Sequence, residues 1–383
     1  MFFDLDLTGE ALPPKTLCLT FDDGPGRTEG DEPGPRTAEI GQFLAERGIA
    51  ATFFVIGAHV RAHPGVVARL RAGGHLVGNH TDTHPTLVSF VRDGGDVVGE
   101  LARADEAIGS PVAGGELTFF RAPYGFWRDE PDPEGLDTGP TSLVAWELNV
   151  DGRFPHLVGP VGWDVDSRDW DCWRHGAGAE ECGRQYLDAI ERAGRGIVLL
   201  HDSSEAAPIR DANRTAELVR WLVPILQERG YRFVRLDAVP GVASAAAVTR
   251  QVELSPAPGW WLTCPADSER IRLTGDRPLT GGLERFGVVP VAQAPDGEVV
   301  ALRAGNGRYL ARTDVGTVVA AGLAVDDSTR WRLDVDPDGR VALAAPSGPV
   351  VALGDAAGSI RLAPNPREAI RFDLQTLVEV SPL

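Results

Sequence analysis

The sequence has little basic charge, little sulfur and no long apolar run. Lysine occurs once, at position 15, and 37 Lys and Arg residues face 55 Asp and Glu residues, which gives a net charge of -18. Phosphate binding needs a basic face, so this balance excludes nucleic acid and anionic membrane surfaces as partners. No apolar run approaches the length of a membrane span, so we expect no membrane-spanning segment.

The four cysteines are scattered and form no C-x-x-C pair, which argues against a cysteine metal site. Cys172 and Cys182 can bridge a local loop in an oxidising compartment, and two free thiols are the simpler alternative. The N-terminal residues MFFDLD contain neither a basic segment nor a long apolar one, so the chain as written carries no secretory signal. At face value we expect a cytoplasmic protein, or an extracellular one if a leader was trimmed or export is non-standard.

Residues 1–240 alternate short apolar runs with amphipathic stretches, which predicts a parallel sheet covered by helices. The expected strands cover residues 16–21, 51–56, 75–78, 117–120, 159–165, 196–201 and 231–235. The expected helices cover residues 35–47, 64–72, 96–108, 180–193 and 212–229. At this length, a closed or nearly closed barrel is the economical form.

The pattern changes after residue 240. Residues 241–250, which include a run of small side chains, are expected to be a linker, and residues 251–383 read as all-β. Related segments recur there: NGRYLA at 306–311 resembles SGPVVA at 347–352, and RWRL at 330–333 resembles IRFD at 370–373. A period of roughly 40 residues allows three copies, which fits a β-trefoil better than a propeller. The spacing resembles the fascin-like trefoils.

Two adjacent carboxylates, Asp22 and Asp23, end the first expected strand in the hexapeptide TFDDGP. Asp-Gly-Pro is ordinary turn chemistry, so the hexapeptide alone does not separate a turn from a functional site. His80 and His84 stand four residues apart, which on a helix or helical turn places both imidazoles within reach of one metal ion. For that spacing alone, surface histidines are the commoner interpretation. A third, anionic ligand is available from Asp22 or Asp23.

Three further stretches follow expected strands, at the edge where parallel α/β folds build active sites. RAPYG begins at Arg121, a residue type that holds carboxylates, and DSRDW covers residues 166–170. His201 ends the apolar run IVLLH, and an Asp partner would raise its pKa and make it a usable general acid. Taken singly, each stretch has a structural alternative. RAPYG can be a strand exit with a surface arginine, DSRDW a solvated loop, and His201 a packed histidine.

Together, TFDDGP, HTDTH, RAPYG, DSRDW and LLH match in order the five motifs of the polysaccharide deacetylases, carbohydrate esterase family 4, and ATFFVIG at 51–57 resembles that family's second strand. The resemblance implies a distorted (β/α) barrel, commonly seven-stranded, and metal-dependent removal of acetyl groups from N-acetylated sugars. It also implies roles for individual residues. These are metal ligands Asp23, His80 and His84; general base Asp22, held by Arg121; oxyanion donor Tyr124, through its backbone N–H; general acid His201, tuned by Asp169; and pocket residues Trp170, Leu199 and Pro123.

Some questions stay open at this stage. The metal is expected to be zinc, with cobalt or nickel binding comparably. The substrate is a chitin-like or peptidoglycan polymer or oligomer; alternatives are a small amide or imide, or a non-catalytic carbohydrate-binding protein. Residues 26–34 and 131–160 look longer than is usual for the family and bear on that choice.

In the C-terminal part, Trp260, Trp261 and Tyr309 are candidates to stack on sugar rings. For Trp331 the pattern favours core packing. We expect a monomer.

Overall fold

The computed structural model describes residues 1–26, 33–109, 117–128, 142–264, 269–275, 284–294, 297–346 and 348–379. The chain divides into two compact units, an α/β unit of residues 6–127 and 156–243, and a β unit of residues 1–5, 128–155 and 244–383. Both segments predicted to be longer than usual, 26–34 and 131–160, fall partly outside the described residues.

A parallel sheet runs through the middle of the α/β unit. Its order is β4-β3-β2-β8-β7, and β9 also pairs with β2. The strands are β2 (Thr16–Gly24), β3 (Thr52–Val55), β4 (Leu76–Asn79), β7 (Val165–Asp166), β8 (Gly196–His201) and β9 (Arg232–Phe233). Every residue of β2 is buried, as expected for a parallel strand covered on both faces.

A second sheet extends this arrangement. Its order is β1-β6-β5, with β1 at Phe2–Leu7, β5 at Thr118–Phe119 and β6 at Leu157–Val161. A parallel bridge between Asn79 and Phe120 joins the end of β4 to the residue after β5. The carboxyl ends of strands from both sheets therefore meet at one edge.

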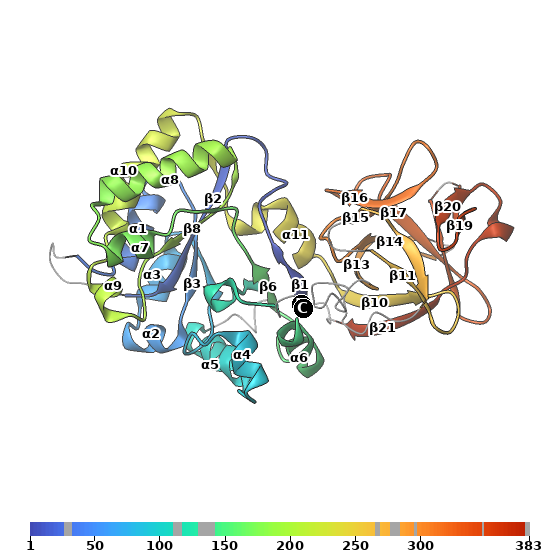
Figure 1. The fold of residues 1–383 in the computed structure, drawn as a ribbon, viewed down its shortest axis with the longest axis horizontal. Helices are drawn as coiled ribbons and strands as arrows, with labels where there is room; N and C mark the ends of the chain where they lie inside the picture. Colours follow the sequence, from blue (N-terminus) through green and yellow to red (C-terminus); the bar gives the residue numbers. More distant parts are fainter. Residues whose placement is uncertain are drawn as a thin grey trace. The chain divides into compact units, whose positions relative to one another are not determined.

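Helices surround these strands in Figure 1, as the alternating pattern predicts. They are α1 (Thr37–Ala45), α2 (Gly57–Ala62), α3 (Val66–Ala72), α4 (Leu87–Arg92), α5 (Val97–Ile108), α7 (Asp169–Arg174), α8 (Ala179–Ala193), α9 (Ala207–Asp211) and α10 (Thr215–Glu228), with 3-10 turns at Pro123–Gly125 and Leu236–Ala238. In α8, Cys182, Tyr186 and Ile190 recur every four residues and are buried against the sheet's core, which explains why this stretch forms an amphipathic helix.

All the predicted strands and helices of this unit are present, with their ends shifted by a few residues. The strand predicted at 159–165 is divided between β6 and β7. In the segment predicted as a linker, 241–250, the first half belongs to helix α11 (Pro240–Ala246). The small residues at 243–247 suggest a linker by their size, but four of the five are alanine, which has the highest helix propensity.

The β unit contains the predicted all-β region. Its strands are β10 (Arg250–Ser255), β11 (Trp260–Thr263), β12 (Arg272–Gly275), β13 (Arg285–Ala294), β14 (Gly297–Arg303), β15 (Tyr309–Arg312), β16 (Val318–Gly322), β17 (Arg330–Val335), β18 (Val341–Ala344), β19 (Val350–Leu353), β20 (Ile360–Ala363) and β21 (Asp373–Glu379). Helix α6 (Leu143–Asp151) and a 3-10 turn at Pro366–Glu368 belong to the same unit.

Antiparallel pairing in the β unit returns to its starting strand. The order β21-β10-β13-β14-β17-β18 is continuous, and Val341 of β18 bridges Phe372, the residue before β21. The pairs β11/β12, β15/β16 and β19/β20 form three hairpins beside it. Phe286, Trp331 and Phe372 each follow an arginine in the sequence, and all three are fully buried in one core. None of the helices in the described ranges is long and apolar enough to cross a bilayer.

Candidate active site

The double Asp lies where β2 ends, beside the ends of β3 and β8. In the strand register Asp22 is opposite Phe54 of β3 and His201 of β8. Asp23 has a φ of 72°, in the left-handed region that few non-glycine residues adopt. Consecutive carboxylates therefore leave the strand in different directions, and each contacts its own set of partners.

The two histidines come from a loop after β4 rather than from a helix or helical turn. Thr81 and His84 both have left-handed φ values, 67° and 59°. The buried carboxylate of Glu100, on α5, accepts hydrogen bonds from the backbone N–H groups of Asp82 at 3.1 Å and Thr83 at 2.8 Å. His84 N–H donates to Thr81 Oγ1 at 3.0 Å. Side-chain acceptors thus replace the carbonyls that a helix would offer to this backbone.

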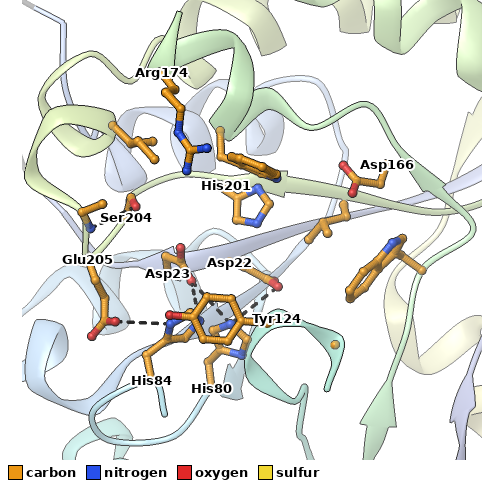
Figure 2. Close-up of a pocket in the computed structure, with 16 residues that line it drawn as sticks. Asp22, Asp23, His80, His84, Tyr124, Asp166, Arg174, His201, Ser204 and Glu205 are labelled. Carbon is orange, nitrogen blue, oxygen red and sulfur yellow. Dashed lines mark hydrogen bonds and ion pairs between the residues drawn. The ribbon is translucent and has the colours of Figure 1, made fainter. Parts of the chain in front are cut away.

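The three predicted metal ligands are brought together (Figure 2). Asp23 Oδ1 lies 3.4 Å from His80 Nε2 and 3.2 Å from His84 Nε2, and one ligand atom from each residue falls within 4.8 Å of the others. Burial alone would raise the pKa of Asp23, but hydrogen bonds from His80 and His84 and the charge of His84 hold it well below its ordinary value. The carboxylate is therefore ionised and available as an anionic ligand.

The donor set fits a divalent cation. Both imidazoles face the buried Asp23 Oδ1, but neither contact has the geometry of a good hydrogen bond, and a cation would satisfy this oxygen. His80 donates its Nδ1 proton to the carbonyl of Arg121 at 2.8 Å, which leaves the Nε2 lone pair directed at Asp23. Two imidazoles and one carboxylate, with positions left for water and substrate, match the ligands of catalytic zinc.

Arg121 holds Asp22 from inside the protein. Its guanidinium, fully buried, donates to Asp22 Oδ1 and Thr20 Oγ1, both at 2.8 Å, and to the carbonyls of Val161 at 3.0 Å and Gly162 at 2.8 Å. With these four acceptors the Arg121 side chain is fixed, and one oxygen of Asp22 is fixed with it. The other oxygen, Oδ2, lies 3.7 Å from His80 Nε2, next to the metal ligands.

His201 and Asp169 form the predicted pair at the end of β8. Asp169 Oδ1 accepts from His201 Nδ1 at 2.7 Å, and Asp169 Oδ2 accepts from the His201 backbone N–H at 2.8 Å. Burial alone would lower the pKa of His201, but the charge and hydrogen bond of Asp169 outweigh it and raise that pKa to about 10. His201 is therefore protonated at neutral pH and presents Nε2–H as a proton donor.

These groups line one pocket of about 500 Å³ (Figure 2). Trp170 and Leu199, predicted to form its wall, are among the lining residues, whereas Pro123 is buried and is not one of them. Tyr124 has a φ of 58°. Its backbone N–H donates to none of the described residues. The next two backbone N–H groups, of Gly125 and Phe126, donate to the carbonyls of Ala122 and Pro123. Such strain in a pocket wall is typical of functional backbone.

Sequence reasoning missed several polar residues of this region. Glu100 supports the histidine loop, Glu205 lies 3.4 Å from His84, and Arg174 lines the pocket. The buried carboxyl of Asp202 accepts a hydrogen bond from Thr37, and burial raises its pKa to about 7. The sequence did offer a signal for Asp202, because this residue directly follows the predicted site residue His201. The others look like ordinary surface charges in the sequence.

The accessory candidates lie in the β unit and differ in exposure. Trp260 is 45 % exposed and Trp261 is half-buried, whereas Tyr309 is 2 % exposed. The interpretation of Tyr309 as a stacking surface is therefore wrong, because its ring is enclosed. Trp331 is fully buried and donates from Nε1 to the carbonyl of Leu310 at 2.9 Å, which confirms core packing. All four cysteines are buried free thiols.

Comparison with known proteins agrees with the geometry. A sequence model described as "Polysaccharide deacetylase" matches residues 9–139. A protein named chitooligosaccharide deacetylase from Rhizobium leguminosarum bv. trifolii is 33% identical over 228 residues, which cover 57% of this chain and 88% of that protein. A peptidoglycan-N-acetylglucosamine deacetylase from Bacillus cereus is 29% identical over 221 residues, which cover 57% of this chain and 68% of that protein.

Among solved structures, a polysaccharide deacetylase from Bacillus cereus is 26% identical and covers 57% of this chain and 91% of its own, with a TM-score of 0.41. The site defines a metal-dependent hydrolase. The chain belongs to the polysaccharide deacetylase family.

Proposed function

We propose that this chain hydrolyses the N-acetyl groups of N-acetylglucosamine units in an oligosaccharide or polysaccharide. The observation that carries the proposal is one pocket that unites the Asp23, His80 and His84 donor set with Asp22 and His201. An amide is a poor electrophile with a poor leaving group, so its hydrolysis needs a polarised carbonyl, an activated water and a proton for the nitrogen. This pocket offers a group for each need.

Asp23, His80 and His84 would hold the cation, with zinc as the proposed metal and cobalt or nickel as substitutes. When bound, a divalent cation polarises a carbonyl oxygen and brings the pKa of a coordinated water to about 7.

The chain's own residues supply the remaining chemistry. Asp22 takes the proton of the attacking water on Oδ2, because Oδ1 is engaged by Arg121. The N–H of Tyr124 stabilises the negative charge that develops on the carbonyl oxygen, a contribution that is typically about 3 kcal/mol for one such donor. His201 then protonates the departing nitrogen from Nε2, because Nδ1 is held by Asp169. The indole of Trp170 and the side chain of Leu199 enclose the acetyl methyl group.

Acetate release tests this function. Protein stripped with chelator would be reloaded with zinc or cobalt and given N-acetyl-chito-oligosaccharides and peptidoglycan in parallel, with Asp22→Asn beside it. We expect metal-dependent release that the substitution abolishes, and the better substrate identifies the physiological polymer class. A metal-loaded protein that releases acetate from neither substrate would contradict the proposal and favour the small-amide alternative.

We propose that the β unit is a trefoil of the fascin-like type and that the α/β unit is a distorted barrel. Three features support the trefoil: the ring of six paired strands, the three hairpins, and the shared core of Phe286, Trp331 and Phe372. The linked sheets support the barrel, for which seven strands stays a prediction.

We also propose that the β unit binds carbohydrate through Trp260, the exposed aromatic at the start of β11. Unchanged retention of full-length Trp260→Ala on chitin and on cell walls would contradict this role.

A further inference from the structure

The two histidine ligands differ in what supports their second nitrogen. The Nδ1 of His80 has a fixed acceptor, the carbonyl of Arg121 at 2.8 Å. The Nδ1 of His84 is buried and makes no hydrogen bond within the distance and angle limits of a good one. The carboxylate of Glu205 faces it, with Oε2 3.4 Å away (Figure 2).

Other contacts fix where His84 stands but not which nitrogen carries its proton. The Tyr124 ring covers one face, with centroids 4.5 Å apart and planes tilted by 56°. The backbone N–H is bonded to Thr81 Oγ1. Neither contact distinguishes the two neutral forms of the imidazole. A metal ligand needs a bare Nε2, which requires the proton on Nδ1 and an acceptor facing it.

We propose that Glu205 is a positioning residue for the metal ligand His84. Its carboxylate accepts the Nδ1–H of His84 and turns the Nε2 lone pair toward Asp23 and the cation. A carboxylate that supports a metal-bound histidine raises the basicity of the ligand and fixes its ring. The inference concerns the metal site itself and rests on the proposed function only through the requirement for a cation.

The surroundings of Glu205 favour this role over an ordinary surface ion pair. Among the described residues, His84 is its one basic partner within ion-pair distance. Glu205 belongs to the segment that joins β8 to α9, which begins directly after His201. One short segment therefore follows the proton donor and supports a metal ligand. The Glu205 side chain is 40 % exposed at the mouth of the pocket, so it can be replaced without opening a cavity in the core.

Zinc affinity of the full chain, measured without substrate by calorimetry against a competing chelator, tests the inference. We expect Glu205→Ala to weaken zinc binding by about 10- to 100-fold. Glu205→Gln should lose less, because its amide oxygen still accepts a hydrogen bond. Asp166→Asn is the matched control, since it removes another exposed carboxylate from the same pocket and should leave the affinity unchanged.

A second measurement separates ligand positioning from a general loss of structure. Cobalt-substituted Glu205→Ala should show an altered visible spectrum, whereas Asp166→Asn should match the unsubstituted protein. A zinc affinity for Glu205→Ala within about twofold of the original would overturn the inference, as would equal losses in Glu205→Ala and Asp166→Asn. Acetate release is read separately, so a protein that needs Glu205 for zinc but deacetylates no sugar would contradict the proposed function alone.

Discussion

At the residue scale, the strongest constraint on the site is the buried ion pair of Asp22 with Arg121. The structure removes both charges from water and gives the guanidinium four acceptors. Removing one member of such a pair leaves a buried charge without compensation, which typically costs about 3–5 kcal/mol. Arg121 thus lies in the core, although its position at a strand exit also allowed a place on the surface.

Arg121→Met is therefore expected to lower the free energy of unfolding by about 3–5 kcal/mol and to abolish deacetylation, because Asp22 loses its support. Urea denaturation and acetate release measure the two effects. Arg184→Met removes the exposed partner of Glu180 on α8 and should cost only about 0.3–0.5 kcal/mol. Similar losses for both variants would show that Arg121 is not the buried anchor described here.

The second prediction at this scale concerns pH. The pKa of His201 is raised to about 10 by Asp169, against about 6.5 for an unfolded histidine. Its protonation therefore stabilises the folded protein fully below pH 6.5, and this contribution disappears as pH rises through about 10. His201, the proposed general acid, loses its proton over the same upper range, so kcat/KM should fall on the alkaline side.

Asp169→Asn should move that alkaline fall to lower pH, since the charge that raises the pKa of His201 is removed, and should also reduce kcat. A pH–rate profile measures both effects. Asp166→Asn, which removes a more exposed carboxylate near the same histidine, should shift the profile less. An unchanged alkaline limb in Asp169→Asn would contradict the assignment of His201 as the acid.

The motif residues could be predicted because their types and order are unusual. Glu100 and Glu205 could not, because glutamate is common on surfaces and their roles depend on contacts with the loop from His80 to His84, which no local pattern shows. Tyr309 was misassigned for a related reason: an aromatic residue in a β repeat serves a core or a ligand surface, and only packing distinguishes them.

At the element scale, the loop from His80 to His84 shows that the spacing of two residues does not determine the backbone conformation between them. Two histidines four residues apart fit a helix, but left-handed Thr81 and His84 break it. Glu100 compensates by accepting two backbone N–H groups, and Arg103 fixes Glu100 at 2.6 Å. The ligands still converge, because the backbone turns back on itself within the same short span.

Glu100→Gln should lower stability by about 1–3 kcal/mol, since an amide cannot satisfy all the donors that face it and buried N–H groups lose their acceptor. It should also weaken zinc binding, because the loop carries both histidines. Urea denaturation of metal-free protein and zinc calorimetry measure these effects. Glu106→Gln, on the exposed side of α5, should change neither, and an effect as large as that of Glu100→Gln would contradict the loop's dependence on Glu100.

Element prediction worked where burial is periodic, as in α8 and α10, and where an apolar run is continuous, as in β2. It failed for short helices such as α2, α7 and α9, which have too few turns to show a period. Helix α11 was missed because small residues carry no hydrophobic pattern, although their helix propensity is high.

At the scale of the whole molecule, the sequence indicated two domains that are each one continuous segment, with a single boundary at 241–250. The β unit also includes residues 1–5 and 128–155. Phe2 shows how this happens: its N–H and carbonyl bond to Asn149 at 3.0 and 2.8 Å, and Gln251 donates to the same carbonyl at 3.3 Å. Contacts between segments so far apart leave no pattern along the chain.

Because each unit has its own buried core, a change in one core should leave the other's transition in place. Trp331→Ala removes a fully buried indole with a hydrogen bond to Leu310 and should cost the β unit about 3–5 kcal/mol. Differential scanning calorimetry should then show one transition shifted down and a second, which rises with added zinc, unchanged. Trp260→Ala, at an exposed position, should leave both transitions in place. If Trp331→Ala lowered both transitions equally, the two cores would unfold as one cooperative body, and a carbohydrate-binding role for the β unit could not be tested independently of catalysis.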